Sequence, residues 1–261
     1  MKQASLMYHD VVAQGRWDES GFPGAAAAHY KLEEGEFARH LDALMTSGLS
    51  FGVVDDTSMQ SRPTCLLTFD DGGASAARVG AALTARSMRG HFFITTSRTG
   101  TRGFVSAEDL RALRRDGHVI GSHSHTHPAE ISRLRSQPLL DEWRRSVECL
   151  GDVLGAPVDV ASIPGGFYSD AVARAAEAAG IRFLFTSEPT ARIGMLNACR
   201  VFGRYTLWRG MDAQRALALA RGEGTARARQ WLTWNLKKPL KRWAGPAYRF
   251  ARTRRLGEPP I

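Results

Sequence analysis

The sequence predicts an α/β fold in which a parallel sheet closes, or nearly closes, into a single (β/α) barrel. Short apolar runs alternate along the chain with amphipathic helical patterns, and 43% of the 261 residues are hydrophobic. A chain of this length can bury a large core, and strand-then-helix alternation is typical of parallel sheets. We find no internal repeat at a fixed period, so a solenoid is not indicated.

Short apolar runs are predicted as strands, and the amphipathic segments between them as helices. Ser106, followed three residues later by Asp109, resembles a capping box and predicts the start of the third helix. In such a barrel the functional side chains follow the C-terminal ends of strands, so polar residues at those points are site candidates. The strands are expected at residues 5–12, 65–70, 91–95, 118–121, 158–163 and 181–186, and the helices at 35–47, 75–87, 107–116, 138–154 and 169–179.

Cysteine usage and the N-terminal residues suggest where the protein works. Cys65, Cys149 and Cys199 form no CxxC pair, so we expect buried free thiols instead of disulfides or a cysteine metal site. No apolar run is long enough to span a bilayer, and the opening MKQASLMYHDVV lacks the apolar core of a signal peptide. A cytoplasmic location is therefore expected.

Positive charge is concentrated at the C-terminal end. The whole chain has a net charge of +9, and the 11 basic and 2 acidic residues from Arg221 onward account for all of it. We therefore expect a barrel over residues 1–220 and a basic, aromatic-rich helical extension over 221–261. In one interpretation of the extension its Trp and Leu side chains pack on the barrel while the cations stay solvated.

Residues 230–256 interleave aromatic and basic side chains, which is also typical of an element on an anionic membrane surface. This interpretation expects peripheral contact with the inner face of the cytoplasmic membrane. Nucleic acid could satisfy the same charges and is the least favoured partner.

Two adjacent carboxylates, Asp70 and Asp71, end the predicted strand LLTFDDG. Neighbouring carboxylates repel each other unless a cation or a shared proton compensates, and the glycines that follow permit a tight turn. The pair suits one metal ligand beside one general base. Taken alone, a solvated Asp-Gly turn is the more ordinary explanation.

The stretch GSHSHTHP, residues 121–128, places His123 and His127 four residues apart after another predicted strand. If the chain enters a helical turn at Ser122, both imidazoles project from one face and can share a metal, whereas His125 points elsewhere. Two imidazoles and a carboxylate leave coordination positions open, as metal-assisted hydrolysis requires. A polar loop of hydrogen-bonded histidines is the alternative.

The segment SIPGGFYS, residues 162–169, places Gly165 and Gly166 at a third strand end. A Pro-Gly-Gly turn exposes backbone N–H groups, which can hold the oxyanion of a tetrahedral intermediate. Tyr168 in the same segment is a candidate substrate contact. Ser187 and Glu188, at the end of the strand FLFTSEP, are candidates of the same kind.

These motifs together resemble the polysaccharide deacetylases with a NodB-homology domain, carbohydrate esterase family four, and in particular members linked to exopolysaccharide synthesis. TFDDG at residues 68–72 matches the first family motif, residues 123–127 match H-[ST]-x-x-H, and SIPGGFYS matches the third motif in part. The flanking GHVIGSHS, DEWRRSVECLGDVLG and AAGIRFLFTSEP are similar as well, so the likeness covers most of the chain.

The resemblance implies a distorted (β/α) TIM-like barrel and a hydrolase that removes N- or O-acetyl groups from a sugar of a polysaccharide or lipid-linked glycan. It implies a divalent metal, zinc or a similar ion, held by Asp71, His123 and His127. Asp70 would be the general base, because a carboxylate bound to a metal is a poor base. An amide near Gly165 would share the charge of the oxyanion.

The chain departs from the family pattern at two places. Ser162 stands where members commonly carry an Arg, and no histidine follows His127, although members use a later histidine as general acid. We expect His9, at the end of the first predicted strand, to replace that acid; a merely hydrogen-bonded histidine is the alternative. Arg200 and Arg204 are candidates for the missing guanidinium.

Two other functions stay open. One is a non-catalytic sugar-binding or scaffold protein on the same fold, and the other is a hydrolase of small amides or formamides. The intact Asp-Asp-Gly and His-x-x-x-His favour an enzyme, because a binding protein has no need of an uncoordinated carboxylate beside a metal ligand.

Overall fold

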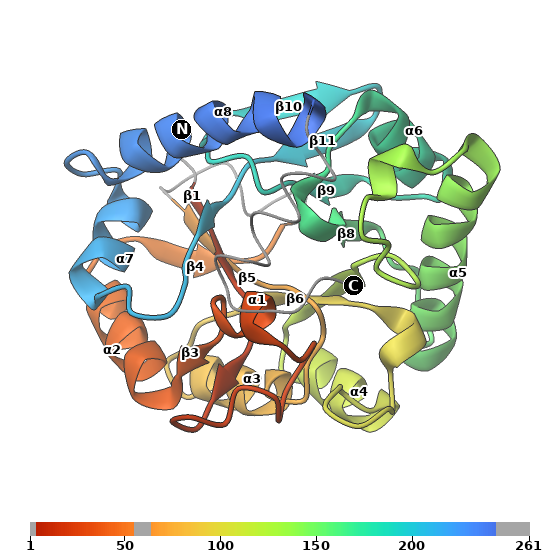
Figure 1. Ribbon diagram of the computed structural model, residues 1–261. Helices are drawn as coiled ribbons and strands as arrows, with labels where there is room; N and C mark the ends of the chain where they lie inside the picture. The colour runs from red at the N-terminus through yellow and green to blue at the C-terminus, as the bar shows by residue number, and fades with distance from the viewer. Residues whose placement is uncertain (1–3, 55–63, 244–261) are drawn as a thin grey trace.

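A computed structural model describes residues 4–54 and 64–243 (Figure 1). Its main sheet has the strand order β10-β11-β9-β8-β7-β6-β5-β1-β12, with β4 paired to β5, and β10 with β11 is the antiparallel pair. The strands β2 (Val11–Val12) and β3 (Leu32–Glu33) pair separately. The main-sheet strands are Ala4–Tyr8 (β1), Ser50–Gly52 (β4), Thr64–Phe69 (β5), Gly90–Ile94 (β6), Val119–Ser122 (β7), Val160–Ser162 (β8), Phe183–Phe185 (β9), Ile193–Leu196 (β10), Cys199–Phe202 (β11) and Tyr205–Thr206 (β12).

Helices surround this curled sheet (Figure 1), which confirms the predicted (β/α) barrel in a distorted, incompletely closed form. The predicted capping box is present as well: Ser106 Oγ accepts a hydrogen bond from the Asp109 N–H, and the Asp109 carboxylate accepts one from the Ser106 N–H. The helices are Ala25–Ala28 (α1), Glu34–Met45 (α2), Ala76–Thr84 (α3), Ala107–Arg115 (α4), Ser136–Leu154 (α5), Asp170–Ala178 (α6), Ala213–Arg221 (α7) and Ala226–Trp243 (α8).

The first predicted strand, residues 5–12, is broken in the structure. β1 ends at Tyr8 and β2 begins at Val11, so His9 and Asp10 form a loop between them. This break leaves His9 directly after the C-terminal end of β1, which lies between β5 and β12 in the sheet. The short strands β10, β11 and β12 were not predicted.

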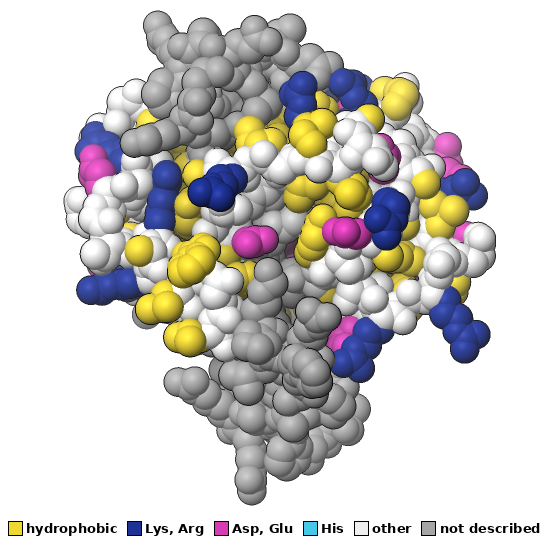
Figure 2. All heavy atoms as spheres, turned by 90° about the horizontal axis from the view of Figure 1, so that it is seen from above, with side chains coloured by type: hydrophobic (Ala, Val, Ile, Leu, Met, Phe, Trp, Pro, Cys, Tyr) yellow, Lys and Arg dark blue, Asp and Glu magenta, His cyan; other side chains and the backbone are white. Residues whose placement is uncertain are grey.

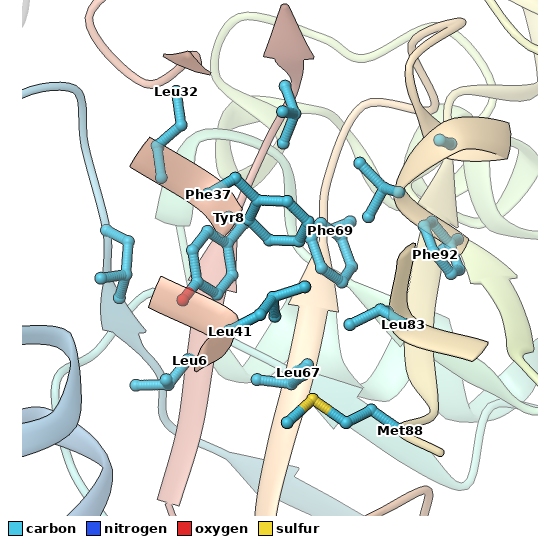
Figure 3. Packing of buried hydrophobic residues seen from close by; sticks show 14 of the residues in the cluster. Leu6, Tyr8, Leu32, Phe37, Leu41, Leu67, Phe69, Leu83, Met88 and Phe92 are labelled. Atoms are coloured by element: carbon cyan, nitrogen blue, oxygen red, sulfur yellow. The ribbon is translucent and has the colours of Figure 1, made fainter. Parts of the chain in front are cut away.

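Aromatic packing under α2 decides which side chains enter the barrel (Figure 3). The Phe69 ring of β5 stacks on Tyr8 of β1 and Phe92 of β6, with centroid distances of 5.4 and 5.0 Å. Phe37 of α2 packs edge-on against Tyr8 and Phe69. Since side chains alternate along a strand, an outward Phe69 leaves Asp70, the next residue, on the inner side.

A short segment that we call the seam, residues 202–205, crosses between the two ends of the sheet. β11 ends at Phe202 and β12 begins at Tyr205, yet β11 lies near one end of the sheet and β12 at the other. The Arg204 N–H donates to the Glu188 carbonyl at 2.8 Å, which ties the seam to the β9 side. A Cβ on Gly203 would lie 2.5 Å from that same carbonyl oxygen, so only glycine fits there.

Two of the three cysteines are buried as predicted, and the prediction is wrong for the third. Cys65 and Cys199 are buried, whereas Cys149 is exposed on α5. Its neighbour Leu150 faces the core, and because successive residues of a helix point in different directions, Cys149 faces solvent. Burial raises the pKa of the Cys65 thiol to about 12.

Candidate metal centre

The Asp70–Asp71 pair is positioned by the end of β5 and a tight turn. The Asp70 N–H donates to the Tyr8 carbonyl, which holds this residue beside β1. Asp71 and Gly72 then both adopt positive φ angles, 77° and 76°. A Cβ on Gly72 would lie 3.2 Å from the Ile94 Cα, so the turn requires glycine. This confirms the predicted turn, and it sends the two carboxylates in different directions.

Asp71, His123 and His127 form a cluster whose ligand atoms all lie within 4.8 Å of one another. The Nε2 atoms of His123 and His127 lie 3.4 and 3.5 Å from the same Asp71 oxygen, Oδ1. Ligands bound at about 2.1 Å in a tetrahedral site lie roughly 3.4 Å apart, so these separations suit one shared ion. Two nitrogens and one oxygen are the ligand types that zinc and similar ions accept.

The two histidines meet as predicted, but not through a helical turn. The chain leaves β7 at Ser122, and Ser124 and His127 have positive φ angles of 63° and 57°. Serine hydroxyls explain the difference: Ser122 Oγ accepts from the Ser124 N–H, and Ser124 Oγ accepts from the His127 N–H. His125 points elsewhere, as predicted, with its Nδ1 2.9 Å from the Thr96 hydroxyl.

Ser162 fixes the orientation of His123. His123 Nδ1–H donates to the Ser162 carbonyl at 3.1 Å, because a carbonyl oxygen can only accept. Nε2 is therefore the atom that is available to a metal. The Ser162 hydroxyl lies 2.6 Å from the same Nδ1 and donates to Asp70 Oδ1 at 3.1 Å. The residue that departs from the family pattern thus connects the metal cluster to the second carboxylate.

Arg204 supplies the missing guanidinium. Its Nη1 and Nη2 atoms donate to the two Asp70 oxygens at 2.6 and 2.8 Å, and both side chains are buried. Nε–H donates to the Thr186 carbonyl, which fixes the plane of the fork. The other candidate, Arg200, lies over the Phe183 ring instead, 5.7 Å from its centroid.

The charges around them keep both carboxyl groups ionised. Burial alone would raise each pKa. The charges of Arg204 and His123 outweigh burial and lower the pKa of Asp70 below its ordinary value. At Asp71, burial is outweighed by the hydrogen bond with His123 and the charges of His9 and His127, and its pKa is lowered as well.

The two histidines titrate differently. Burial, aided by the charge of His123, lowers the pKa of His127 to about 4, so its imidazole is neutral at neutral pH. Burial also opposes the charged form of His123, but the carboxylates of Asp70 and Asp71 outweigh it and raise its pKa. A metal that binds His123 must therefore displace a proton from Nε2.

His9 lies near this centre. It follows β1, and its positive form lowers the pKa of both Asp70 and Asp71. The ring is partly exposed, its centroid lies 5.0 Å from that of Tyr30, and its buried Nδ1 has no hydrogen-bond partner among the described residues. The expected role of a simple hydrogen-bonded histidine therefore has no support at Nδ1.

The third motif forms a 3₁₀ turn over Pro164–Gly166, with φ angles of 61° at Gly165 and 68° at Gly166. The Gly166 N–H donates to the Ile163 carbonyl at 3.3 Å. This bond corrects the prediction that both glycines offer an amide to the oxyanion, because it occupies the Gly166 amide. The role expected for the Gly165 amide stays a prediction.

The other predicted substrate contacts do not join the metal cluster. Tyr168 and Glu188 line a cavity of about 680 Å³ beside the rim, and none of the metal-cluster residues lines it. Ser187 Oγ contacts Met7 Sδ at 3.7 Å. Tyr168 and Glu188 follow the ends of β8 and β9, so the cavity borders the same rim as the metal cluster.

The loop around Phe22, which lies against the metal cluster, was not identified from the sequence. The Phe22 ring packs against His127, with a centroid distance of 4.8 Å. Lys31 Nζ donates to the carbonyls of Trp17, Ser20 and Phe22 at 2.6 to 2.7 Å, which holds the loop in place. A single Lys and a single Phe in a loop carry no sequence signal for this role.

Comparisons with known proteins show which family this chain resembles. A family model, Polysaccharide deacetylase, matches residues 58–184. YxkH of Bacillus subtilis (strain 168), classed among the polysaccharide deacetylases, is 24% identical over 212 residues, covering 78% of this chain and 69% of YxkH.

Two solved structures show the same fold. The Streptococcus pyogenes deacetylase PplD, solved in complex with acetate, has a TM-score of 0.71 at 16% identity over 84% of this chain and 98% of PplD. IcaB from Ammonifex degensii has a TM-score of 0.69 at 21% identity over 84% of this chain and 97% of IcaB. The fold and the centre define a hydrolase. The chain is similar to the polysaccharide deacetylases, which are hydrolases, both in the family match over residues 58–184 and in its likeness to YxkH.

Proposed function

We propose that this protein is a metal-dependent deacetylase that hydrolyses an N- or O-acetyl group on a sugar of a polysaccharide or lipid-linked glycan. The observation that supports this proposal best is that the adjacent carboxylates of Asp70 and Asp71 contact different partners. Asp71 lies between two imidazole nitrogens, and Asp70 is held by the buried guanidinium of Arg204. A non-catalytic sugar-binding protein would not need one carboxylate in the metal cluster and a second, separate carboxylate beside it.

Asp71, His123 and His127 would hold the divalent cation, zinc or a similar ion. When bound, such an ion polarises an acyl carbonyl and acidifies a water molecule. Asp70 accepts the proton of the attacking water, and Arg204 keeps its carboxylate ionised and oriented for that transfer. The Gly165 amide is the proposed donor to the oxyanion.

Metal removal is expected to abolish the reaction. We expect acetate release from a panel of N-acetylhexosamine oligomers to stop after chelation and to return when Zn²⁺ is added back. We also expect elemental analysis to find one ion per wild-type chain and a large loss of metal in His127→Gln, because this variant removes one of three ligand atoms.

The same panel separates the alternatives. Metal binding without release of any acyl group would favour a scaffold protein. Release from small amides or formamides, and not from sugars, would favour the second alternative. Activity that persists unchanged in fully chelated protein would contradict the proposed metal dependence.

His9 is the proposed general acid for the leaving group, because it lies near both carboxylates and no histidine follows His127. We expect His9→Gln to lower the rate of acetate release about 10²-fold or more without changing the metal content. His125→Gln is the matched control, since His125 belongs to the same rim and lies outside the metal cluster. Equal rates in the two variants would show that another group protonates the leaving group.

A further inference from the structure

Exposed large hydrophobic side chains gather on one side of the molecule. Apart from Met45 on α2, those among the described residues belong to β10, to α8 or to the cavity between them. Tyr168, Met195 and Trp231 line that cavity together, which shows that the two elements are neighbours. We define the α8–β10 face by these side chains: Tyr168, Ile193, Met195, Trp231, Leu232 and Leu236.

The inner side of α8 is fixed by polar contacts with the barrel. The Gln230 side chain donates to the Thr206 carbonyl and accepts from the Thr206 N–H, at 2.8 and 3.1 Å. Arg227 donates to the Leu219 and Ala220 carbonyls at the end of α7. These bonds place the polar Gln230 and Arg227 against the protein.

The outer side of α8 is apolar. Leu232 and Leu236, four residues apart on one side of the helix, are 54% and 64% exposed, and Trp231 beside them is 51% exposed. A surface helix of a soluble protein normally buries its apolar side and exposes its polar one. Three large apolar side chains exposed together indicate that something apolar covers this face.

The charge on α8 indicates what covers it. The helix sequence contains six basic residues and no acidic one, and Arg192 and Arg229 are exposed beside the apolar side chains. Figure 2, which looks down on the side of the molecule that carries α8 and β10, shows hydrophobic and Lys or Arg side chains next to one another, with some Asp or Glu side chains between them. Apolar side chains among cations suit a surface that combines acyl chains with negative headgroups.

We propose that the α8–β10 face docks on an anionic lipid bilayer, with Trp231, Leu232 and Leu236 entering the headgroup region and with Arg192 and Arg229 facing lipid phosphates. A second copy of this chain would bring like charges together, and exposed Leu and Met side chains contribute nothing to phosphate binding in a nucleic acid. No helix among the described residues is long and apolar enough to cross a bilayer, so the contact is peripheral.

Docking would set the active-site rim beside the lipid surface, because Tyr168 and Glu188 follow the ends of strands that also border the metal cluster. The proposal stands independently of the proposed chemistry. It rests on the side chains described up to Leu236 and on the charge of the α8 sequence; residues 244–256 of the predicted membrane segment lie outside the described residues.

Sedimentation with lipid vesicles tests the proposal on the full chain. We expect binding to vesicles of phosphatidylcholine with phosphatidylglycerol and much weaker binding to phosphatidylcholine alone. Leu232→Gln combined with Leu236→Gln leaves the charge unchanged and is expected to weaken binding to the anionic vesicles at least about tenfold, since two apolar side chains lose their burial. Met45→Gln is the matched control, because Met45 is equally exposed and lies on α2.

A thermal melt followed by circular dichroism checks that each variant is folded, and Trp231→Ser provides a second, independent variant of the face. The proposal would be wrong if the wild-type protein did not bind anionic vesicles. It would also be wrong if the variants of the α8–β10 face bound these vesicles as well as Met45→Gln does. Self-association or binding to a single-stranded oligonucleotide that is lost in the face variants, without vesicle binding, would assign the face to that partner instead.

Discussion

Asp70→Asn is expected to abolish acetate release from N-acetylated sugar oligomers while the protein keeps its metal. Asp70 lies next to the metal cluster but is not part of it, because its oxygens accept hydrogen bonds from Arg204 and Ser162. An amide cannot accept the proton of the attacking water, so the rate is expected to fall about 10²- to 10⁴-fold. The measurement is acetate release together with elemental analysis on the same sample.

Asp71→Asn is the matched control, because it changes the neighbouring carboxylate in the same way. This variant removes the oxygen that both imidazole nitrogens face, so it is expected to lose both metal and activity. A rate within a few-fold of wild type in Asp70→Asn would place the general base elsewhere. Loss of metal from Asp70→Asn would make Asp70 a ligand.

Arg204→Met is expected to destabilise the protein by about 3 to 5 kcal/mol, because it leaves the buried carboxylate of Asp70 without its partner. Denaturant unfolding measures this loss. The control is Arg200→Met, which removes a guanidinium that lies over the Phe183 ring and is expected to cost less than about 1 kcal/mol. Equal losses in the two variants would show that the buried pair does not stabilise the fold.

The same substitution is expected to change the pH dependence of hydrolysis. Arg204 holds the pKa of Asp70 below its ordinary value, so removing the guanidinium raises that pKa. A general base works only when it is deprotonated, so the acidic limb of the residual rate should move to higher pH. In the double variant Asp70→Asn/Arg204→Met neither charge remains, and part of the lost stability should return.

The barrel and the three residues of the metal cluster could be predicted because their sequence signals are local. The strand ending in TFDDG and the His-x-x-x-His spacing can each be recognised within a few residues. The conformation of the histidine loop was not predicted, because the hydroxyls of Ser122 and Ser124 accept hydrogen bonds from backbone N–H groups and replace the expected helical turn.

Arg204 is the opposite case. It was one of two candidate guanidinium groups, and nothing in the sequence distinguished it from Arg200. Its partner Asp70 lies 134 residues away, and the two meet only because β12 pairs with β1 at the far end of the curled sheet. A contact made by closing a barrel has no local pattern, so only the structure could choose between them.

The seam determines when Asp70 acquires its charge partner during folding. The three residues of the candidate metal cluster all precede residue 128, whereas Arg204, which binds Asp70, lies directly before β12, the strand that pairs with β1. A chain that is still being synthesised, or one whose seam has opened, has its three ligands but lacks the counter-ion of Asp70. The buried carboxylate of Asp70 therefore acquires its counter-charge only when residues 202–205 have joined the two ends of the sheet.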